Sequence, residues 1–307
     1  MNARILKNHE RFKAVWAGRT RELAEIQCNK VAVVVHVFYP ELWPEIGARL
    51  QRIRHPFDLF VTTSPELADA VTTAVIERFP AAHIHLFANK GMDVWPFLRL
   101  APTWVANNYV AVCKLHTKRG EGAQGSTWRR AMLEPLVGDS AIFQQVAEAF
   151  AENSDLQMVG PAPLYQSAHH LMLKNAPLVN ELQRKLVGKT LSGEDWGFFV
   201  GNMFWVRPSA LQVLAPLAQP GGPLAEERFE SSYERDGQLV HAVERVFGLL
   251  PRLQNGAIGL IHNAMTGGWT LQVAETEPTP SRAFIRELIP QCEALQRELR
   301  RAQDASL

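Results

Sequence analysis

A run of five apolar residues at positions 31–35, Val-Ala-Val-Val-Val, constrains the fold of this chain more than any other feature. β-Branched residues without polar alternation are typical of a strand that is buried on both faces of a parallel sheet. Further strand-like segments follow at intervals that leave room for helices, and this alternation predicts βαβ units. The expected strands are 31–35, 58–62, 83–87 and 109–115, and the expected helices between them are 41–53, 64–79 and 93–100.

The second half of the chain is expected to be mostly helical, with short strands between the helices. The expected helices are 128–136, 141–152, 175–188 and 238–250, and the expected strands are 158–161, 201–207 and 258–262. Together these elements predict an α/β fold, in which helices flank a mixed, mostly parallel sheet and the chain carries a helical insertion. We expect three parts, which are a helical extension (1–29), the α/β domain (30–270), and a linker with a C-terminal helix (271–307).

Composition excludes several classes of protein. The formal net charge of +1 argues against a protein that coats nucleic acid, which needs a basic field over many phosphates. No stretch approaches the roughly 20 apolar residues of a membrane-spanning helix, and the N-terminal region lacks an apolar signal-peptide core. Cys28, Cys113 and Cys292 match no zinc or disulfide pattern, and the first two are expected to be buried thiols. We therefore expect a soluble, cytoplasmic protein, and peripheral association with the inner face of a membrane stays open.

A cluster of cations lies at the end of the strand expected over residues 109–115. In parallel sheets, ligands bind beyond the carboxyl ends of the strands. Lys114, His116, Lys118 and Arg119 could there hold an anion such as the diphosphate of a nucleotide. The alternative is a solvated basic loop. Lys114 argues against that alternative, because a lysine within a strand must snorkel, pair or bind something.

Polar residues also follow the strand expected over residues 83–87. Asn89 and Asp93 flank Gly91, which permits a tight turn. Asp93 either caps the helix that follows or accepts a hydrogen bond from a sugar or ribose hydroxyl. The sequence leaves both roles open.

The segment 236–245 places several chemically active side chains on one expected helix. His241, Glu244 and Arg245 share one side of that helix, and Asp236 lies just before it. A carboxylate at this position could take a proton from an acceptor hydroxyl as general base. The alternative is a surface arrangement in which these residues pair only with one another.

The aromatic segment 201–207, Gly-Asn-Met-Phe-Trp-Val-Arg, follows the adjacent acids Glu194 and Asp195. These residues could bring a carboxylate and an aromatic stacking platform into one pocket, with Asn202 and Trp205 as substrate contacts. An aromatic strand is more often part of the core, and this alternative carries the greater weight.

No metal ligand can be assigned from the sequence. His262 follows the last expected strand and could ligate a metal or contact a diphosphate, although a lone histidine more often has neither role. No Asp-x-Asp follows any expected strand, so the usual paired aspartates for Mg²⁺ or Mn²⁺ are not visible. Lys114, Lys118 and Arg119 could supply the positive charge instead, and a divalent Mg²⁺ or Mn²⁺ cofactor stays open. Dinucleotide-binding, Walker A, zinc and Ser-His-Asp signatures are also missing.

Five motifs in order resemble the rhamnan synthesis F family of bacterial polysaccharide proteins, over about residues 31–262. The motifs are His-Val-Phe-Tyr-Pro-Glu-Leu-Trp (36–43), Pro-Phe-Asp-Leu-Phe-Val-Thr-Thr (56–63), Lys-Leu-His-Thr-Lys (114–118), Gly-Asn-Met-Phe-Trp-Val-Arg-Pro (201–208) and Asp-Gly-Gln-Leu-Val-His-Ala-Val-Glu-Arg (236–245). The resemblance implies a GT-A-like fold and transfer of rhamnose, or a related deoxysugar, from a nucleotide-sugar donor. Among such donors, dTDP-rhamnose is the one expected first. The implied acceptor is a lipid-linked glycan such as a rhamnan or an O-antigen. The family pattern Asn-Arg-Gly-Arg-Asp reads Asn-Lys-Gly-Met-Asp here, so Met92 replaces an arginine.

The leading hypothesis is therefore a glycosyltransferase. Lys114, His116, Lys118 and Arg119 would hold the donor diphosphate, Asn89 and Asp93 would contact donor hydroxyls, and Glu244 or Asp236 would be the general base. The alternative is an inactive carbohydrate-binding or scaffold protein of the same pathway, which Met92 and the missing Asp-x-Asp favour. A hydrolase that uses Glu194 and Asp195 is a third hypothesis and the weakest, because neighbouring acids cannot readily flank one glycosidic bond.

Overall fold

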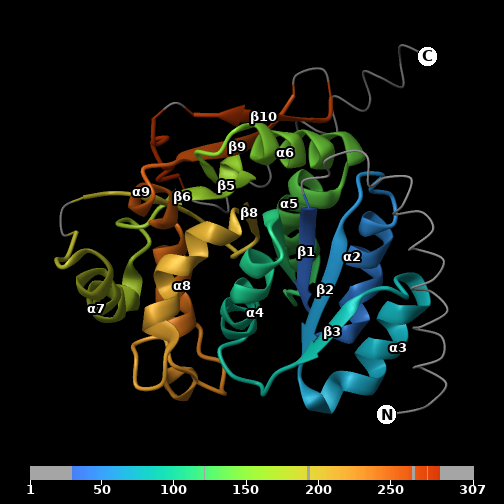
Figure 1. Ribbon diagram of the computed structural model, residues 1–307, viewed down its shortest axis with the longest axis horizontal. Helices are drawn as coiled ribbons and strands as arrows, with labels where there is room; N and C mark the ends of the chain where they lie inside the picture. Colours follow the sequence, from blue (N-terminus) through green and yellow to red (C-terminus); the bar gives the residue numbers. More distant parts are fainter. Residues whose placement is uncertain (1–29, 121, 192–193, 265–266, 275, 284–307) are drawn as a thin grey trace.

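Eight strands form one mixed sheet in the order β10-β9-β5-β8-β4-β1-β2-β3 (Figure 1). The computed structural model describes residues 30–283, except 121, 192–193, 265–266 and 275, so the extension 1–29 and nearly all of the expected C-terminal helix lie outside the described residues. The strands are β1 (Lys30–His36), β2 (Asp58–Thr63), β3 (His83–Leu86), β4 (Tyr109–His116), β5 (Leu156–Pro161), β8 (Phe204–Val206), β9 (Ala257–Asn263) and β10 (Trp269–Val273).

The sheet combines a parallel part with antiparallel additions. β1 pairs in parallel with β2 and with β4, and β2 pairs in parallel with β3. β8 runs antiparallel to both β4 and β5, and β10 runs antiparallel to β9. The prediction of an α/β fold with a mixed, mostly parallel sheet is confirmed, and the architecture is compatible with a GT-A-like fold.

Helices cover both faces of the sheet because its central strands are apolar on both faces. Val31, Val33 and Val35 of β1 face one core, whereas Ala32 and Val34 face the other. Figure 1 shows α2 and α3 on one side of the sheet and α7 and α8 on the other. The first core is covered by α2 (Trp43–Leu50), α3 (Ala68–Arg78), α5 (Gly122–Val137) and α6 (Ser140–Glu152), and the second by α4 (Val94–Ala106), α7 (Ala176–Val187), α8 (Leu239–Phe247), α9 (Leu250–Leu253) and the 3₁₀ helix η5 (Pro208–Ala218).

The structure departs from the sequence expectations at several element boundaries. The expected helices 41–53 and 64–79 each begin as a 3₁₀ turn, η1 (Pro40–Leu42) and η2 (Pro65–Leu67), with proline at the first position. Ser64 occupies the N-cap position of η2 but makes no side-chain capping hydrogen bond. The sequence reading also missed β10 and the two-stranded antiparallel sheet of β6 (Tyr165–Ser167) and β7 (Gly197–Phe199). No helix within the described residues is long and apolar enough to span a membrane.

Candidate functional site

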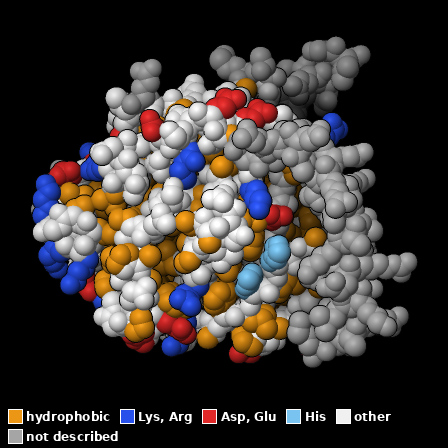
Figure 2. Space-filling view, in the orientation of Figure 1, with side chains coloured by type: hydrophobic (Ala, Val, Ile, Leu, Met, Phe, Trp, Pro, Cys, Tyr) orange, Lys and Arg blue, Asp and Glu red, His pale blue; other side chains and the backbone are white. Residues whose placement is uncertain are grey.

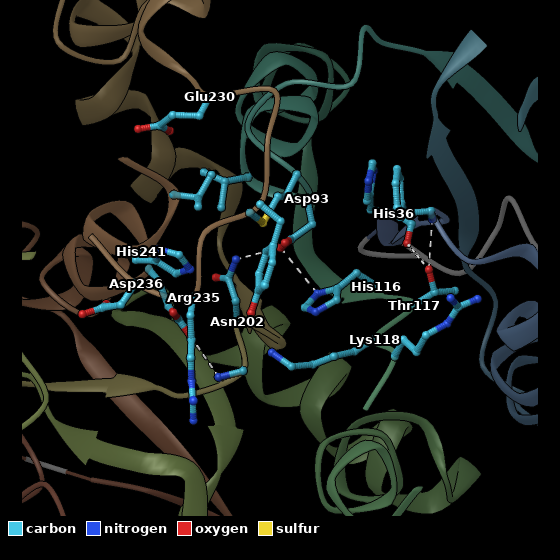
Figure 3. Close-up of a pocket in the computed structure, with 18 of the residues that line it drawn as sticks. His36, Asp93, His116, Thr117, Lys118, Asn202, Glu230, Arg235, Asp236 and His241 are labelled. Carbon is cyan, nitrogen blue, oxygen red and sulfur yellow. Dashed lines mark hydrogen bonds and ion pairs between the residues drawn. The ribbon is translucent and has the colours of Figure 1, made fainter. Parts of the chain in front are cut away.

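A pocket of about 660 Å³ opens at the carboxyl ends of β1 and β4. Its walls come from segments far apart in the chain, which are the loops after β1, β3 and β4, the turn before β8, the segment 230–236 and helix α8 (Figure 3). The lining includes ten of the residues predicted from the sequence, namely Asn89, Asp93, His116, Lys118, Arg119, Asn202, Asp236, His241, Glu244 and Arg245. Strand ends that the sequence placed at one sheet edge therefore meet at one cavity.

Asp93 lies at the centre of a buried polar cluster in this pocket. Its Oδ2 atom accepts hydrogen bonds from Lys114 Nζ and from Asn202 Nδ2, the latter at 2.7 Å, and lies 3.4 Å from His116 Nδ1. Burial alone would raise the pKa of Asp93, but His116 and Lys114 hold it well below its ordinary value. Asp93 is thus a fixed carboxylate rather than a helix cap, for its side chain makes no capping hydrogen bond.

Lys114 serves the fold rather than the ligand. Only 1% of its surface is exposed, and its Nζ donates to Asp93 and to the carbonyl oxygen of Asn202 at 2.9 Å. The rings of Phe97 and Phe204 lie 5.4 and 5.8 Å from the same atom. Lys114 is not among the pocket-lining residues, so its position does not support the predicted contact with a donor diphosphate. The sequence argument that a lysine inside a strand must pair with something holds, and Asp93 is the partner.

Two histidines next to Asp93 are kept neutral by their surroundings. Burial lowers the pKa of His116 to about 3, and the positive charges of Lys114 and Lys118 act in the same direction. Burial likewise lowers the pKa of His36 to about 4, and its Nδ1 lies 3.0 Å from Thr62 Oγ1. At neutral pH both imidazoles are therefore hydrogen-bonding groups without charge.

The two buried histidines predict a loss of stability on mild acidification. Their pKa values in the folded state lie below the ordinary value of 6.5, so the unfolded chain takes up protons first as the pH falls. The free energy of unfolding should be highest above pH 6.5 and fall as the pH approaches 4. We expect a loss of about 2 kcal/mol per histidine between pH 7.5 and pH 5.

Urea unfolding at pH 7.5 and pH 5 checks this expectation. The variant His116→Gln should lose less stability over that interval than the wild type, by about the contribution of one histidine. An identical pH dependence in wild type and variant would show that His116 is not buried in neutral form.

Lys118 and Arg119 differ although they are neighbours in sequence. Arg119 forms an ion pair with Glu41 and lies over the ring of Tyr39, 4.3 Å from its centroid. Lys118 reaches into the pocket from the end of β4 (Figure 3) and forms no ion pair with any described residue. Of this basic segment, Lys118 therefore remains available for an anionic ligand.

A tight turn connects the Asp93 cluster to helix α8. Gly201 and Asn202 have φ angles of +92° and +59°, in the left-handed region, so the strand expected over 201–207 begins only at Phe204. The Gly201 N–H donates to Glu244 Oε1 at 2.9 Å, while Asn202 binds Asp93. Among the described residues, Glu244 Oε2 accepts one hydrogen bond, from Arg245 Nη1 at 3.4 Å. One oxygen of Glu244 is thus fixed and the other is held loosely within the pocket.

Arg245 has a largely structural environment. Its side chain is buried and donates to the carbonyl oxygens of Leu171 and His241, the latter at 2.7 Å. Its guanidinium carbon also lies 5.1 Å from the ring centroid of Phe198. Arg245 therefore holds α8 against the segment around Leu171, and few N–H groups of its guanidinium remain for a ligand.

Asp236 and His241 are both engaged in local structure. Asp236 accepts hydrogen bonds from the N–H of Lys174 at 3.0 Å and from Asn175 Nδ2 at 2.7 Å. Burial would raise the pKa of Asp236, but these hydrogen bonds hold it below its ordinary value. His241 Nδ1 accepts the N–H of Gln238 at the start of α8, which places the proton of a neutral ring on Nε2. Neither group is well suited to accept a proton from a substrate.

Two predicted substrate contacts lie outside the pocket. Trp205 is fully buried against Phe143 on the opposite face of the sheet, because Phe204 and Val206 take the face toward α4 and α8. His262 lies on β9, three strands away from β4. The pocket therefore does not support the predicted ligand contacts of either residue, and Trp205 is a core residue, as the alternative weighed for the aromatic strand had it.

The adjacent acids Glu194 and Asp195 are likewise not pocket residues. Glu194 pairs with Arg252, and Asp195 accepts hydrogen bonds from Ser167 and Arg282. The hydrolase hypothesis therefore has no support from their position.

The sequence reading predicted Asp236 but missed residues 230–235 as part of the site. Glu230, Tyr233 and Arg235 line the pocket from this segment, and Tyr233 is 73% exposed. The sequence Glu-Ser-Ser-Tyr-Glu-Arg-Asp lacks periodicity and follows no strand, so only its aromatic and cationic residues could have marked it.

The described residues offer no ready-made metal centre. No group of three or more His, Cys, Asp or Glu side chains lies close enough together within them to hold a metal ion. The oxygen of Asp93 that faces the cluster is already bound to Lys114 and Asn202. The geometry of these residues does not fit a divalent cation held by protein ligands alone.

Comparison with known proteins assigns the chain to a family. Residues 15–255 match the model of rhamnan synthesis protein F. The chain is also similar to the uncharacterized protein WxcX of two Xanthomonas campestris pv. campestris strains, B100 and ATCC 33913, with 28% identity over 255 residues in each case. That similarity covers 80% of this chain but only 36% of each relative, so the chain spans about a third of their length. The chain belongs to the rhamnan synthesis protein F family.

Proposed function

We propose that this chain is a glycosyltransferase that moves rhamnose, or a related deoxysugar, from a nucleotide-sugar donor to a cell-surface polysaccharide. Its family indicates a role in polysaccharide synthesis. The observation that carries the proposal is that one pocket is lined by three groups, which are Lys118, a cation with no ion pair among the described residues, Glu244, with one loosely held carboxylate oxygen, and the fixed carboxylate of Asp93.

The donor is proposed to lie with its diphosphate next to Lys118. Positive charge at that position stabilises the charge that develops on the leaving group as the glycosidic bond breaks. Asp93 would accept hydrogen bonds from the sugar hydroxyls, because it is ionised and can only accept. Asn89 could either donate hydrogen bonds to these hydroxyls or accept them, because its side chain is an amide. The donor most consistent with the family is dTDP-rhamnose.

The acceptor hydroxyl is proposed to approach from the side of α8. Its proton passes to Glu244 while its oxygen forms a bond to the anomeric carbon of the donor sugar. The bond from that carbon to the diphosphate breaks, and its electron pair leaves with the diphosphate. Glu244 suits this role better than Asp236, since both oxygens of Asp236 already accept hydrogen bonds. A lipid-linked glycan, reached by peripheral association with the inner face of the bacterial membrane, is the proposed acceptor.

A thermal-shift screen tests the proposal without knowledge of the acceptor. A ligand that binds only the folded state stabilises it by mass action, by about 2.7 kcal/mol at a concentration 100 times its Kd. We expect a selective rise in Tm with dTDP-rhamnose compared with UDP- and GDP-linked sugars. Repeating the screen with Mn²⁺ or Mg²⁺ shows whether a cation bridges the diphosphate. No rise with any nucleotide sugar would contradict the proposed function.

One observation favours a second candidate, a carbohydrate-binding protein without turnover. Met92 lines the pocket directly before Asp93, at the position where the resemblance implies an arginine. Its φ angle of +48° turns the chain there, so an arginine at this position would also lie at the pocket wall. Donor binding with no transfer in the wild type, and transfer in Met92→Arg, would establish this candidate.

A further inference from the structure

Arg235 is an unpaired cation that the family motif does not include. It lines the pocket from the segment 230–236, opposite the end of β4. Four acidic residues also line the pocket, but the structure gives Arg235 no ion pair with them or with any other described residue. An exposed arginine at a pocket wall without a carboxylate partner is a candidate for an anionic ligand, because its planar fork binds phosphate in two places.

The other cations of the pocket are accounted for. Arg119 is bound to Glu41 and Arg245 to two carbonyl oxygens, and Lys114, which lies behind the pocket wall, is bound to Asp93. Basic side chains that gather on the surface near α7 (Figure 2), such as Arg184 and Lys185, belong to the last turn of that helix and do not line the pocket. Two uncompensated cations remain in the pocket among the described residues, Lys118 and Arg235.

The charge of Lys118 lowers the pKa values of histidines on both sides of the cavity. Burial is the main cause that lowers the pKa values of His116 and His241, and Lys118 lowers both further. His116 ends β4, whereas His241 lies on α8, so the ammonium group lies in the space between these elements. Figure 3 shows Lys118 extending from the β4 side of the pocket and Arg235 standing on the α8 side.

The backbone around Arg235 is held in place before any ligand binds. The buried side chain of Gln238 donates to the carbonyl oxygen of Ser232 at 2.7 Å and accepts the N–H of Glu234 at 2.9 Å. Asp236, the next residue after Arg235, is bound to Lys174 and Asn175. The segment 230–236 is therefore fixed on both sides of Arg235, while the side chain of Arg235 itself is exposed.

We infer that Lys118 and Arg235 form a two-sided clamp for the diphosphate of a nucleotide ligand, with Lys118 binding from β4 and Arg235 from the segment before α8. The inference rests on the proposed function, and adds to it a binding residue that the basic segment after β4 does not supply. A diphosphate carries charge on two phosphoryl groups, which suits two cations that face each other across a cavity better than one cation on a loop.

Calorimetric titration with dTDP, thymidine and geranyl diphosphate tests the clamp. Arg235→Gln should weaken binding of dTDP by about 10-fold to 100-fold, because a charge-assisted hydrogen bond is lost, and Lys118→Gln should have a similar effect. Thymidine lacks the diphosphate, so its affinity should be the same in wild type and variants. Arg130→Gln is the matched control, since Arg130 is an exposed arginine outside the pocket, and should bind dTDP like the wild type.

The outcomes separate the clamp from the proposed function. A wild type that binds none of the nucleotides or nucleotide sugars contradicts the proposed function itself. If Arg235→Gln binds dTDP as tightly as the wild type does, the clamp is overturned and the proposed function is not. A loss confined to geranyl diphosphate would assign Arg235 to the lipid-linked acceptor and would also overturn it. Circular dichroism of Arg235→Gln should match the wild type, which excludes unfolding as the cause of weak binding.

Discussion

Lys114→Met is expected to destabilise the folded protein by about 3–5 kcal/mol, the usual cost of removing one partner from a buried ion pair. The variant is destabilised because the buried carboxylate of Asp93 remains without its ion-pair partner. Asp93 would keep its charge in a site where its side chain is only 14% exposed, and would lose its closest cation. Methionine preserves the apolar length of the lysine next to Phe97 and Phe204, so the loss of packing is small.

Urea unfolding of single and double variants checks this expectation. In Asp93→Asn with Lys114→Met the buried charges are both gone, and the amide can still accept the hydrogen bond from Asn202. The double variant should therefore recover at least half of the lost stability. A single variant Lys114→Met as stable as the wild type would show that the pair is not buried as described.

Glu244→Gln is expected to reduce glycosyl transfer by at least 100-fold, which is the lower range for loss of a general base. The glutamine can still accept the Gly201 N–H, so the turn that carries Asn202 should keep its position. Donor affinity should accordingly stay within about threefold of the wild type, which separates loss of chemistry from loss of binding.

Transfer of labelled rhamnose from dTDP-rhamnose to lipid-linked glycan in membrane extracts provides the assay for this variant. Glu77→Gln is the matched control, because Glu77 is exposed on α3 far from the pocket, and it should transfer like the wild type. Unchanged transfer by Glu244→Gln would move the search for the base to another pocket residue.

Patterns of apolar residues predicted the fold well, because a strand that is buried on both faces of a sheet has a continuous apolar sequence. The valine run at 31–35 and the strand at 109–115 lie at the centre of the sheet, where both faces are covered. Short strands such as β6 and β7 were missed, since three residues are too few to show a period. β10 was missed because its side chains are only partly buried at the edge of the sheet.

The site was predicted in position more accurately than in detail. Strand ends located the pocket, because parallel strands bring their carboxyl ends to one edge. Sequence could not show that Lys114 points inward to Asp93 while Lys118 points to the cavity, since this depends on the antiparallel partner β8 and on α4. Nor could it place Arg235 opposite Lys118, because their approach depends on how α8 packs on the sheet.

Nuclear magnetic resonance of the histidine side chains, followed during titration with dTDP-rhamnose, tests the central claim most directly. If the donor diphosphate lies next to Lys118, the imidazole signals of His116 and His241 should move on binding, and the pKa of His116 should rise because negative charge has come close. His83 and His262, which do not line the pocket, should keep their signals. Binding that shifts His262 and leaves His116 and His241 unchanged would contradict the account.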